Sequence, residues 1–256
     1  WTVGYLTDVG QDAVSDRMVG FMAAQGIDTS RIGRRADRTV GLYLIELKGA
    51  ERSFSYWRDR SAARLLADDA ARLDAALAGV RLAYVSGITL AVLEGAGQAN
   101  LLAALGRARA AGTVVAFDPN LRPRLWTDGD TMRAAVMAGA AQADIVLPSH
   151  EDEAAHFGDA DPAATAARYA AAGARTVVVK DGAGEVLCLS GGAVTRHRPA
   201  PVVRVVDTTA AGDSFNAGFL ARWLAGASAA EAMVAGSAIA AQVIGARGAL
   251  VAVTPG

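Results

Sequence analysis

The sequence predicts an α/β fold with a mostly parallel central sheet and a smaller group of strands near the N-terminus. From about residue 61 onward, amphipathic helical stretches alternate with short apolar runs, which is typical of a parallel sheet covered by helices on both faces. Before that point, two strand-like runs follow each other without a crossover helix, so we expect them to pair antiparallel and apart from the main sheet.

The N-terminal part predicts a strand, a helix and a hairpin, in that order. The strand is expected at Thr2–Thr7 and the helix at Asp12–Gln25, where Gly26 ends the helical pattern. The hairpin joins Thr39–Leu47 to Glu51–Arg58, because apolar residues in these runs tend to recur at every second position.

The rest of the chain predicts helix–strand pairs, an edge hairpin and two closing helices. The helix–strand pairs are Ala62–Ala78 with Arg81–Val85, Glu94–Ala110 with Thr113–Phe117, Met132–Ala141 with Asp144–Leu147, and Pro162–Ala172 with Thr176–Lys180. Glu185–Ser190 and Ala193–Arg198 are expected to form a hairpin at one sheet edge, and Gly212–Ala225 and Ala229–Ile244 the last helices.

The composition excludes several classes of partner. A chain of 256 residues with 52% hydrophobic and 20% charged residues can bury one large core, with or without a small lid. A net charge of -1 argues against nucleic acid or an anionic membrane as a partner, and no apolar run approaches the length of a membrane helix. Cys188 is the only cysteine, which fits a reducing compartment, so we expect a cytoplasmic protein.

The stretch DTTAAGDSFNAGFLA, residues 207–221, predicts an anion site at the start of a helix. Phe215 and the residues after it predict a helix packed into a core, whereas the residues before it are small and polar. Gly212 leaves backbone N–H groups uncovered at the positive helix end, which favours an anion. Asp213 is open to two interpretations there, as a helix cap or as a base that acts on the anion's reaction partner.

Polar residues and glycines follow three of the predicted parallel strands. These segments are Asp118–Arg122, Ser149–Glu153 and Asp181–Gly184. Because ligands of open parallel sheets bind beyond the carboxyl ends of the strands, we expect the functional site at this rim. No Gly-x-Gly-x-x-Gly follows the first strand and no P-loop motif occurs, which disfavours Rossmann dehydrogenases and P-loop enzymes.

Together these segments resemble the ribokinase-like (PfkB-type) sugar kinases. The most specific piece is DTTAAGDSFNAGFLA, and TVGLYLIEL…RSFSYWR, DPNLRPRLW and VVVKDGAGEV support it. The resemblance covers essentially the whole chain and implies one kinase domain over residues 1–256, a ribokinase-like three-layer sandwich with lid strands near residues 1–8 and 38–60. It also implies transfer of the ATP γ-phosphoryl group to a sugar hydroxyl.

The chain departs from the family pattern at two places. Family members normally begin with a strand and a Gly-Gly…Asn sugar-binding motif, which is not found here, so we expect that a native N-terminal segment is missing before Trp1. The family's Asn-x-x-Glu motif aligns with Ser149…Asp152, where serine replaces asparagine.

The resemblance implies a catalytic centre around Asp213. Asp213 is expected to be the general base, and the amides of Ala210, Ala211 and Gly212 to stabilise the transferring phosphoryl group. Gly212 is also expected to touch the nucleotide, together with Ser149, Lys180, Gly182 and Gly184.

The implied cofactors are ATP and Mg²⁺, with a monovalent cation such as K⁺ as a further candidate. Asp152 is the candidate for positioning magnesium indirectly, through water. Asp207 and Thr209 could offer backbone carbonyls to the monovalent cation, as in relatives.

The stretch SFSYWRDRSAAR predicts an acidic sugar. Tyr56 and Arg58 lie two apart on a predicted strand and so point to one face, where an arginine favours a carboxylate. This stretch resembles the 2-keto-3-deoxygluconate kinases of the family, which implies that Tyr43, Tyr56 and Arg58 contact the sugar acid, with Arg122 nearby. The expected product is 2-keto-3-deoxy-6-phosphogluconate.

The alternatives are a kinase of the same fold for a neutral sugar or nucleoside, and a catalytically silent sugar-binding protein. The sequence does not separate the gluconate from the galactonate epimer. An apolar lid strand often docks on a second copy, so a homo-oligomer, a dimer or higher, is expected.

Overall fold

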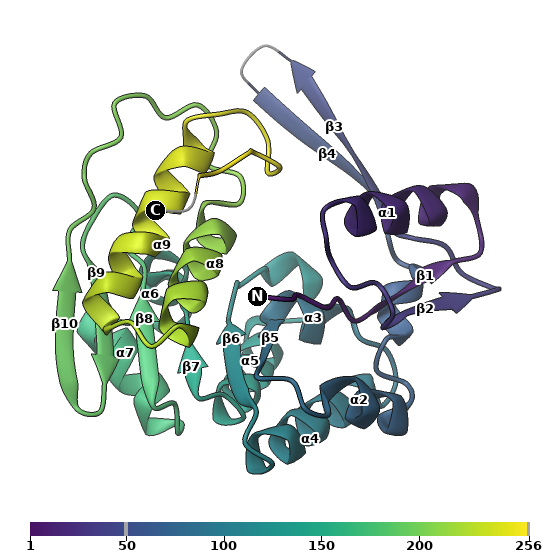
Figure 1. Cartoon of the computed structure of the whole chain (residues 1–256), viewed down its shortest axis with the longest axis horizontal. Helices are drawn as coiled ribbons and strands as arrows, with labels where there is room; N and C mark the ends of the chain where they lie inside the picture. The colour runs from purple at the N-terminus through teal and green to yellow at the C-terminus, as the bar shows by residue number, and fades with distance from the viewer. Residues whose placement is uncertain (49–50, 255–256) are drawn as a thin grey trace. The chain divides into compact units, whose positions relative to one another are not determined.

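The computed structural model describes residues 1–48 and 51–254, and the side chains of residues 45–54 lie outside that description (Figure 1). Its backbone contacts separate into two compact units. Unit 1 comprises Trp1–Val80 and Thr89–Thr113, and unit 2 comprises Arg81–Ile88 and the chain from Val114 onward. The prediction of one domain over the whole chain is not decided by this division and stays a prediction.

Unit 2 contains the predicted main sheet. Its strand order is β10-β9-β8-β7-β6-β5. The strands are β5 (Leu82–Ser86), β6 (Val114–Asp118), β7 (Ile145–Val146), β8 (Thr176–Val179), β9 (Val186–Ser190) and β10 (Ala193–His197). Strands β5 to β8 run parallel, and β9 and β10 add an antiparallel edge, as the sequence predicts.

Helices cover both faces of this sheet (Figure 1). One face carries α8 (Ala211–Leu224) and α9 (Ala229–Ile244), and the other carries α5 (Gly129–Ala141), α6 (His150–Phe157) and α7 (Pro162–Ala171). The short 3₁₀ helix η2 (Pro123–Leu125) follows β6. The result is the predicted three-layer α/β sandwich.

The core under α8 and α9 fixes the position of both helices. Phe215 and Phe219 of α8 and Met233 of α9 pack on strand residues such as Ile145 and Val178, all nearly or fully buried. Burying one such side chain contributes about 1.5–3 kcal/mol. The helices approach so closely that a Cβ at Gly218 would lie 2.9 Å from a backbone oxygen of α9. Packing on the sheet and on α9 therefore fixes the position of the start of α8.

Unit 1 contains two small sheets and several helices. Its elements are β1 (Thr7–Gly10), α1 (Ala13–Ala24), β2 (Ile32–Arg35), β3 (Leu42–Lys48), β4 (Glu51–Trp57), η1 (Ala62–Leu65), α2 (Ala70–Leu77) and α4 (Gly97–Ala110). Helix α3 (Gly87–Val92) begins in unit 2 and ends in unit 1. The antiparallel pairing of β3 with β4 confirms the predicted hairpin, whose turn at residues 49–50 lies outside the described residues.

Two predictions for unit 1 are wrong in detail. The first strand starts only at Thr7 and pairs in parallel with β2, a strand that the sequence analysis missed. The helix predicted over Ala62–Ala78 is interrupted, because the Asp69 carboxylate accepts the amides of Ala71 and Arg72 and so starts a new helix, α2. In unit 2, the polar segment after Ser149 forms α6. The sequence analysis missed this helix because the segment has too few apolar residues to show a helical pattern.

Among the described residues, no helix is both long and apolar enough to cross a membrane.

Candidate active site

The start of α8 lies at the predicted rim and has an unusual backbone. Ala210 precedes the helix in the left-handed conformation, with φ +61°, and its methyl group cannot cap the helix. The amide of Ala211 donates to Thr208 O at 3.2 Å. The N–H groups of Gly212 and Asp213 belong to the first helical turn, where no intrahelical acceptor exists. This turn therefore presents N–H donors of the kind that anions bind, and the anion site itself stays a prediction.

Asp213 is exposed at this turn, yet the surrounding protein removes part of its water. That desolvation and the nearby Asp118 carboxylate raise the pKa of Asp213, while Lys180 and Arg122 lower it. A carboxyl group with a raised pKa, reachable from solvent and beside an anion site, is suited to accept a proton from a hydroxyl group.

A polar network lies directly behind this turn, in which Asp118 and Asn216 are buried and Tyr84 is 43% exposed. Lys180, the residue after β8, donates from Nζ to Asn216 Oδ1 at 2.9 Å. Asn216 Nδ2 donates to Asp118 Oδ2 at 2.7 Å and to the Tyr84 hydroxyl at 3.2 Å. Lys180 Nζ also lies 3.6 Å from Asp118 Oδ2. Four elements of unit 2 thus meet at one point: the middle of β5, the ends of β6 and β8, and the first turns of α8.

Arg122 and Asp152 form a second charged pair at the rim. Arg122 Nη1 lies 3.7 Å from Asp152 Oδ2, and both side chains are at least partly exposed. Desolvation raises the pKa of Asp152, and Arg122 opposes the rise. Ser149, the residue before α6, makes no side-chain cap, and it bridges to Lys180 through the backbone.

The other candidate residues at the rim of unit 2 form turns and hydrogen bonds that shape the backbone. Gly182 has φ +52°, and the Gly184 amide donates to Asp181 O at 2.6 Å, which closes a tight turn after β8. The Asp207 carboxylate accepts the Thr209 amide at 2.9 Å and the Gly248 amide at 2.9 Å, which joins two loops. Nucleotide contact by the glycines and cation binding by Asp207 and Thr209 stay predictions.

The predicted sugar-binding residues of unit 1 lie together on the β3–β4 hairpin. Tyr43 and Tyr56 are directly paired across the strands, with ring centroids 6.2 Å apart. The Arg58 guanidinium lies 4.3 Å from the centre of the Tyr56 ring, so these two side chains share a face, as predicted. Tyr43 is 61% exposed and Tyr56 47%.

The sequence analysis missed the roles of Asn216, Asp118 and Tyr84. Asn216 follows Asp213 by three residues, which places both on one side of α8, and it is only 1% exposed. A lone asparagine within an otherwise apolar helical stretch was the available signal. Asp118 belongs to a predicted rim segment, but its role as the buried partner of Asn216 depends on contacts between elements far apart in the chain.

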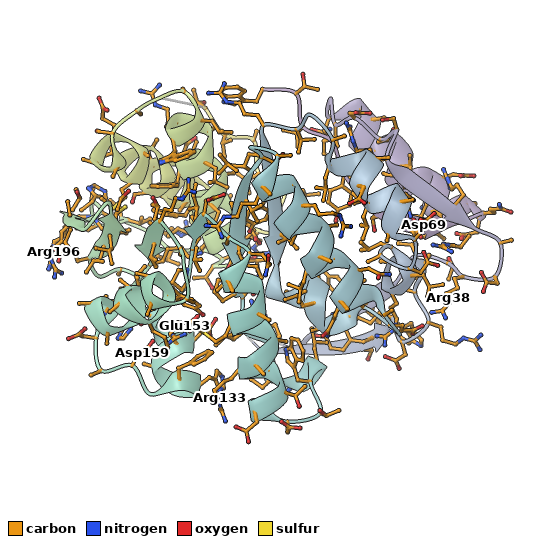
Figure 2. The ribbon with its side chains drawn as sticks, turned by 90° about the horizontal axis from the view of Figure 1, so that it is seen from below. Arg38, Asp69, Arg133, Glu153, Asp159 and Arg196 are labelled. Atoms are coloured by element: carbon orange, nitrogen blue, oxygen red, sulfur yellow. The ribbon has the colours of Figure 1, made fainter. Side chains whose placement is uncertain are left out.

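A second charged cluster links α6 to α7, and Figure 2 labels two of its members, Glu153 and Asp159. The fully buried Glu153 accepts hydrogen bonds from Arg168 at 2.7 Å and from the Tyr169 hydroxyl at 2.9 Å, and Arg168 also pairs with Asp159. Burial raises the pKa of Glu153 to about 7, although Arg168 and Tyr169 oppose the rise. Glu153 therefore faces the protein interior, whereas its neighbour Asp152 lies at the rim and pairs with Arg122.

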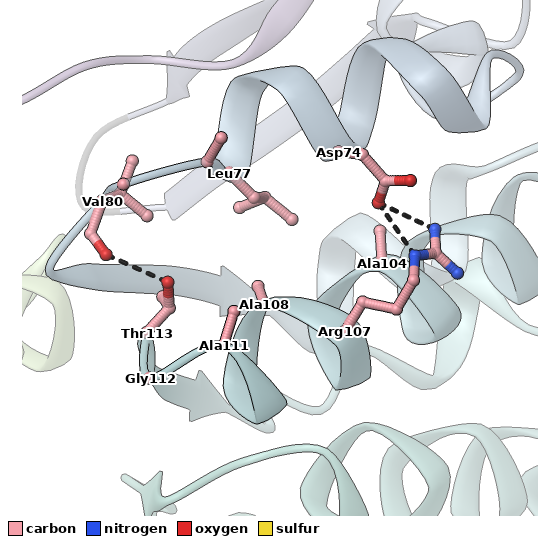
Figure 3. Close-up of a pocket in the computed structure, with 11 residues that line it drawn as sticks. Asp74, Leu77, Val80, Ala104, Arg107, Ala108, Ala111, Gly112 and Thr113 are labelled. Carbon is pink, nitrogen blue, oxygen red and sulfur yellow. Dashed lines mark hydrogen bonds and ion pairs between the residues drawn. The ribbon is translucent and has the colours of Figure 1, made fainter.

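A pocket of about 340 Å³ lies elsewhere in unit 1 and contains none of the predicted site residues (Figure 3). Its charged residues satisfy each other, since Arg107 donates to Asp74 at 2.8 Å. The Thr113 hydroxyl donates to Val80 O at 3.0 Å. The remaining walls are mostly alanine, leucine and glycine, so this pocket offers little for recognition of a polar ligand.

Comparison with known proteins decides the family. The family model described as pfkB family carbohydrate kinase matches residues 2–254. The chain belongs to this family. As a pfkB-family carbohydrate kinase it has the predicted ribokinase-like fold and enzyme class, so both predictions are confirmed.

Individual relatives of this pfkB-family kinase are similar over nearly all of the chain. The 2-dehydro-3-deoxygluconokinase of Escherichia coli strain K12 is 39% identical over 98% of this chain and 83% of its own. The crystal structure of a PfkB protein from Polaromonas sp. JS666 has a TM-score of 0.86 at 31% identity, over 95% of this chain and 80% of its own. A fructokinase with bound ATP from Xylella fastidiosa has a TM-score of 0.83 at 26% identity, over 96% and 80%.

Proposed function

We propose that this pfkB-family kinase transfers the γ-phosphoryl group of ATP to a hydroxyl of 2-dehydro-3-deoxygluconate, also called 2-keto-3-deoxygluconate. The observation that carries the substrate is the 39% identity to a 2-dehydro-3-deoxygluconokinase over 98% of the chain. The arginine and two tyrosines gathered on the β3–β4 hairpin agree with an acidic sugar. The fructokinase neighbour with bound ATP supports ATP as the donor.

In this mechanism Asp213 removes the proton from the sugar hydroxyl as that oxygen attacks the γ-phosphorus. The bond from the γ-phosphorus to the bridging oxygen breaks, ADP leaves, and the proton stays on the Asp213 carboxyl group until it is passed to solvent. The amides of Gly212 and Asp213 donate to the phosphoryl oxygens as their negative charge is redistributed, whereas the Ala211 amide is already bonded to Thr208 O. The protein thus contributes alignment, a base and positive potential.

Magnesium fits this arrangement as a partner of the nucleotide. Mg²⁺ prefers hard oxygen ligands and is usually held by one or two carboxylates together with substrate phosphates. Asp152 offers such a carboxylate at the rim, and the described residues contain no cluster of three or more metal-binding side chains. When bound, the ion would neutralise phosphate charge, with Asp152 positioning it through water.

The acid group of the sugar is the proposed partner of Arg58. A guanidinium binds a carboxylate through two parallel hydrogen bonds, and the Tyr56 ring already orients Arg58 by stacking. Tyr43 and Tyr56 offer hydroxyl groups for the remaining sugar hydroxyls, and Arg122 is a further cation for the acid. A neutral sugar would leave the Arg58 charge without a partner.

The test is a coupled ATP assay over acid and neutral sugars. We expect kcat/KM for 2-dehydro-3-deoxygluconate to exceed that for fructose or ribose at least about 100-fold, since one desolvated charge pair contributes about 2–5 kcal/mol. The galactonate epimer belongs in the same panel, because it differs at one hydroxyl. Higher kcat/KM for fructose would show a neutral-sugar kinase instead, and no turnover with any sugar would indicate a silent binding protein.

Three lesser proposals follow from the same family membership. A monovalent cation at the carbonyls of Asp207 and Thr209 would make turnover higher in KCl than in choline chloride. The exposed β3–β4 hairpin would mediate a homo-oligomer, which sedimentation measures directly. A cytoplasmic location would be tested by fractionation of the source cells.

A further inference from the structure

The buried network behind α8 is not used in the mechanism so far. Asn216 contacts Asp118 and Tyr84 through its NH₂ group and Lys180 through its carbonyl oxygen. Since a carboxylate only accepts and an ammonium only donates, this arrangement fixes the orientation of the Asn216 amide. The amide in turn fixes the Lys180 side chain, which is 12% exposed.

The Lys180 ammonium lies against the anion-binding turn. A Cβ placed at Gly212 would have Lys180 Nζ as its neighbour, at 3.7 Å. An ammonium group has three N–H donors, and Asn216 accepts from one of them at 2.9 Å. Asp118 is 3.6 Å away, which is an ion-pair distance rather than a hydrogen bond. Donor capacity therefore remains for an anion held at the amides of Gly212 and Asp213.

Stability alone explains this network poorly. A buried ion pair contributes little to folding, because the desolvation of two charges offsets their attraction. In other proteins, replacing a buried ion pair by apolar residues of similar volume is often neutral or stabilising. The desolvation of Lys180 and Asp118 has a functional explanation if the network holds the Lys180 ammonium at the place where phosphoryl transfer needs a positive charge.

We propose that Asn216 and Asp118 are positioning residues that hold the Lys180 ammonium at the first turn of α8, where it binds the terminal phosphoryl group of ATP. The inference rests on the proposed function. It deepens that function by assigning Lys180 to the γ-phosphoryl group rather than to the nucleoside. ADP lacks this group, so Lys180 distinguishes ATP from ADP.

Binding of two nucleotides tests the proposal without turnover. Calorimetric titration with ADP and with the non-hydrolysable analogue AMP-PNP, both with Mg²⁺, compares the wild type with Lys180→Met. We expect the variant to bind AMP-PNP about 10- to 100-fold more weakly and ADP within about 3-fold of wild type, as for loss of a charge-assisted hydrogen bond. Equal losses for both nucleotides, or no loss, would overturn the assignment.

Arg175→Gln is the matched control, because Arg175 directly precedes β8 and Lys180 directly follows it. Arg175 is 79% exposed, and Nε lies 3.6 Å from Asp144 Oδ1. Its substitution also removes one positive charge, but at the opposite end of the strand. We expect its nucleotide affinities to equal those of wild type, and a comparable loss of AMP-PNP binding would reduce the Lys180 effect to net charge.

Asn216→Leu separates positioning from folding. It keeps the Lys180 charge but frees it, so we expect about 3- to 10-fold weaker AMP-PNP binding with ADP unchanged. Lys180 lowers the pKa of Asp213, so the acid limb of the kcat/KM profile should move to higher pH in both Asn216→Leu and Lys180→Met. Tyr84→Phe loses a hydroxyl of the same network without touching Lys180. If Tyr84→Phe moved the acid limb of the kcat/KM profile as far as Asn216→Leu does, the network would support the fold without positioning Lys180.

A wild type that binds ADP and AMP-PNP but phosphorylates no sugar would overturn the proposed function and leave this one standing on its binding data. A wild type that binds neither nucleotide would overturn both.

Discussion

The start of α8 and the β3–β4 hairpin carry the two halves of the proposed reaction, and they are built in opposite ways. Behind α8, Asp118 and Asn216 are almost fully buried and hydrogen-bonded to each other. Asp118 fixes the Asn216 amide, and that amide fixes Lys180. On the hairpin, Tyr43 and Tyr56 are about half exposed and contact each other, and Arg58 stacks on Tyr56 alone. The difference matches the chemistry that each region must perform.

Phosphoryl transfer is the same for every sugar, and it needs donors that are already in place before the reaction. A buried network provides this and tolerates little change. Sugar recognition differs between relatives, and exposed side chains can be exchanged without disturbing a core. Substitutions near α8 should therefore reduce turnover with all sugars, whereas substitutions on the hairpin should affect one class of sugar.

The largest effect is expected from Asp213→Asn. The amide cannot accept the hydroxyl proton, so kcat should fall about 10³-fold with every sugar, within the range for loss of a general base. Asp130→Asn is the control, since Asp130 also lies in the first turn of a unit 2 helix and is 94% exposed. Near-normal turnover of Asp213→Asn would remove Asp213 from the mechanism.

The same variant should be more stable than wild type at neutral pH. The folded state raises the pKa of Asp213, so folding favours its protonated form. The charged Asp213 carboxylate therefore lowers the free energy of unfolding. This loss of stability is fully present above the raised pKa and disappears below the ordinary value of 3.8. The gain in melting temperature of Asp213→Asn should vanish as the pH falls through this range, whereas a gain that is constant with pH would exclude charge as its cause.

An intermediate and selective effect is expected from Arg58→Gln. Loss of the guanidinium should lower kcat/KM for 2-dehydro-3-deoxygluconate about 100-fold and leave a neutral sugar unchanged, because only the acid has a carboxylate to lose. Arg60→Gln, at an exposed position two residues later, is the control. Equal losses for acid and neutral sugars would mean that Arg58 only stiffens the hairpin.

The contrast also explains what the sequence could predict. The alternation of helices and strands and the DTTAAGDSFNAGFLA stretch are local patterns, and they placed the parallel sheet and Asp213 at the correct rim. The hairpin was equally local, so the shared face of Tyr56 and Arg58 followed from spacing alone. Family likeness supplied the reaction, which no spacing determines.

The network behind α8 could not be predicted in this way. It joins residues 84, 118, 180 and 216, which meet only because β5, β6 and β8 lie in one parallel sheet and α8 packs on it. The break between η1 and α2 was missed for a different reason. Asp69 competes as a cap within a segment whose alanines and leucines otherwise continue the helical pattern.

The smallest effect concerns the backbone that presents the amides. Ala210 has φ +61°, a conformation that costs a residue with a Cβ about 1–2 kcal/mol. Glycine removes this strain but increases the entropy of the unfolded chain, which costs about 0.4–1 kcal/mol, so Ala210→Gly should raise the free energy of unfolding by about 0 to 1.6 kcal/mol. Ala211→Gly is the matched control, because Ala211 is helical and the same exchange there should destabilise by roughly 0.5–1 kcal/mol. Opposite signs in urea unfolding, with kcat within about 2-fold in both variants, would show that the strain belongs to Ala210 and that the amides keep their positions. Equal signs would mean that the left-handed residue is not strained, and the amide donors would then be held by the packing of α8 alone.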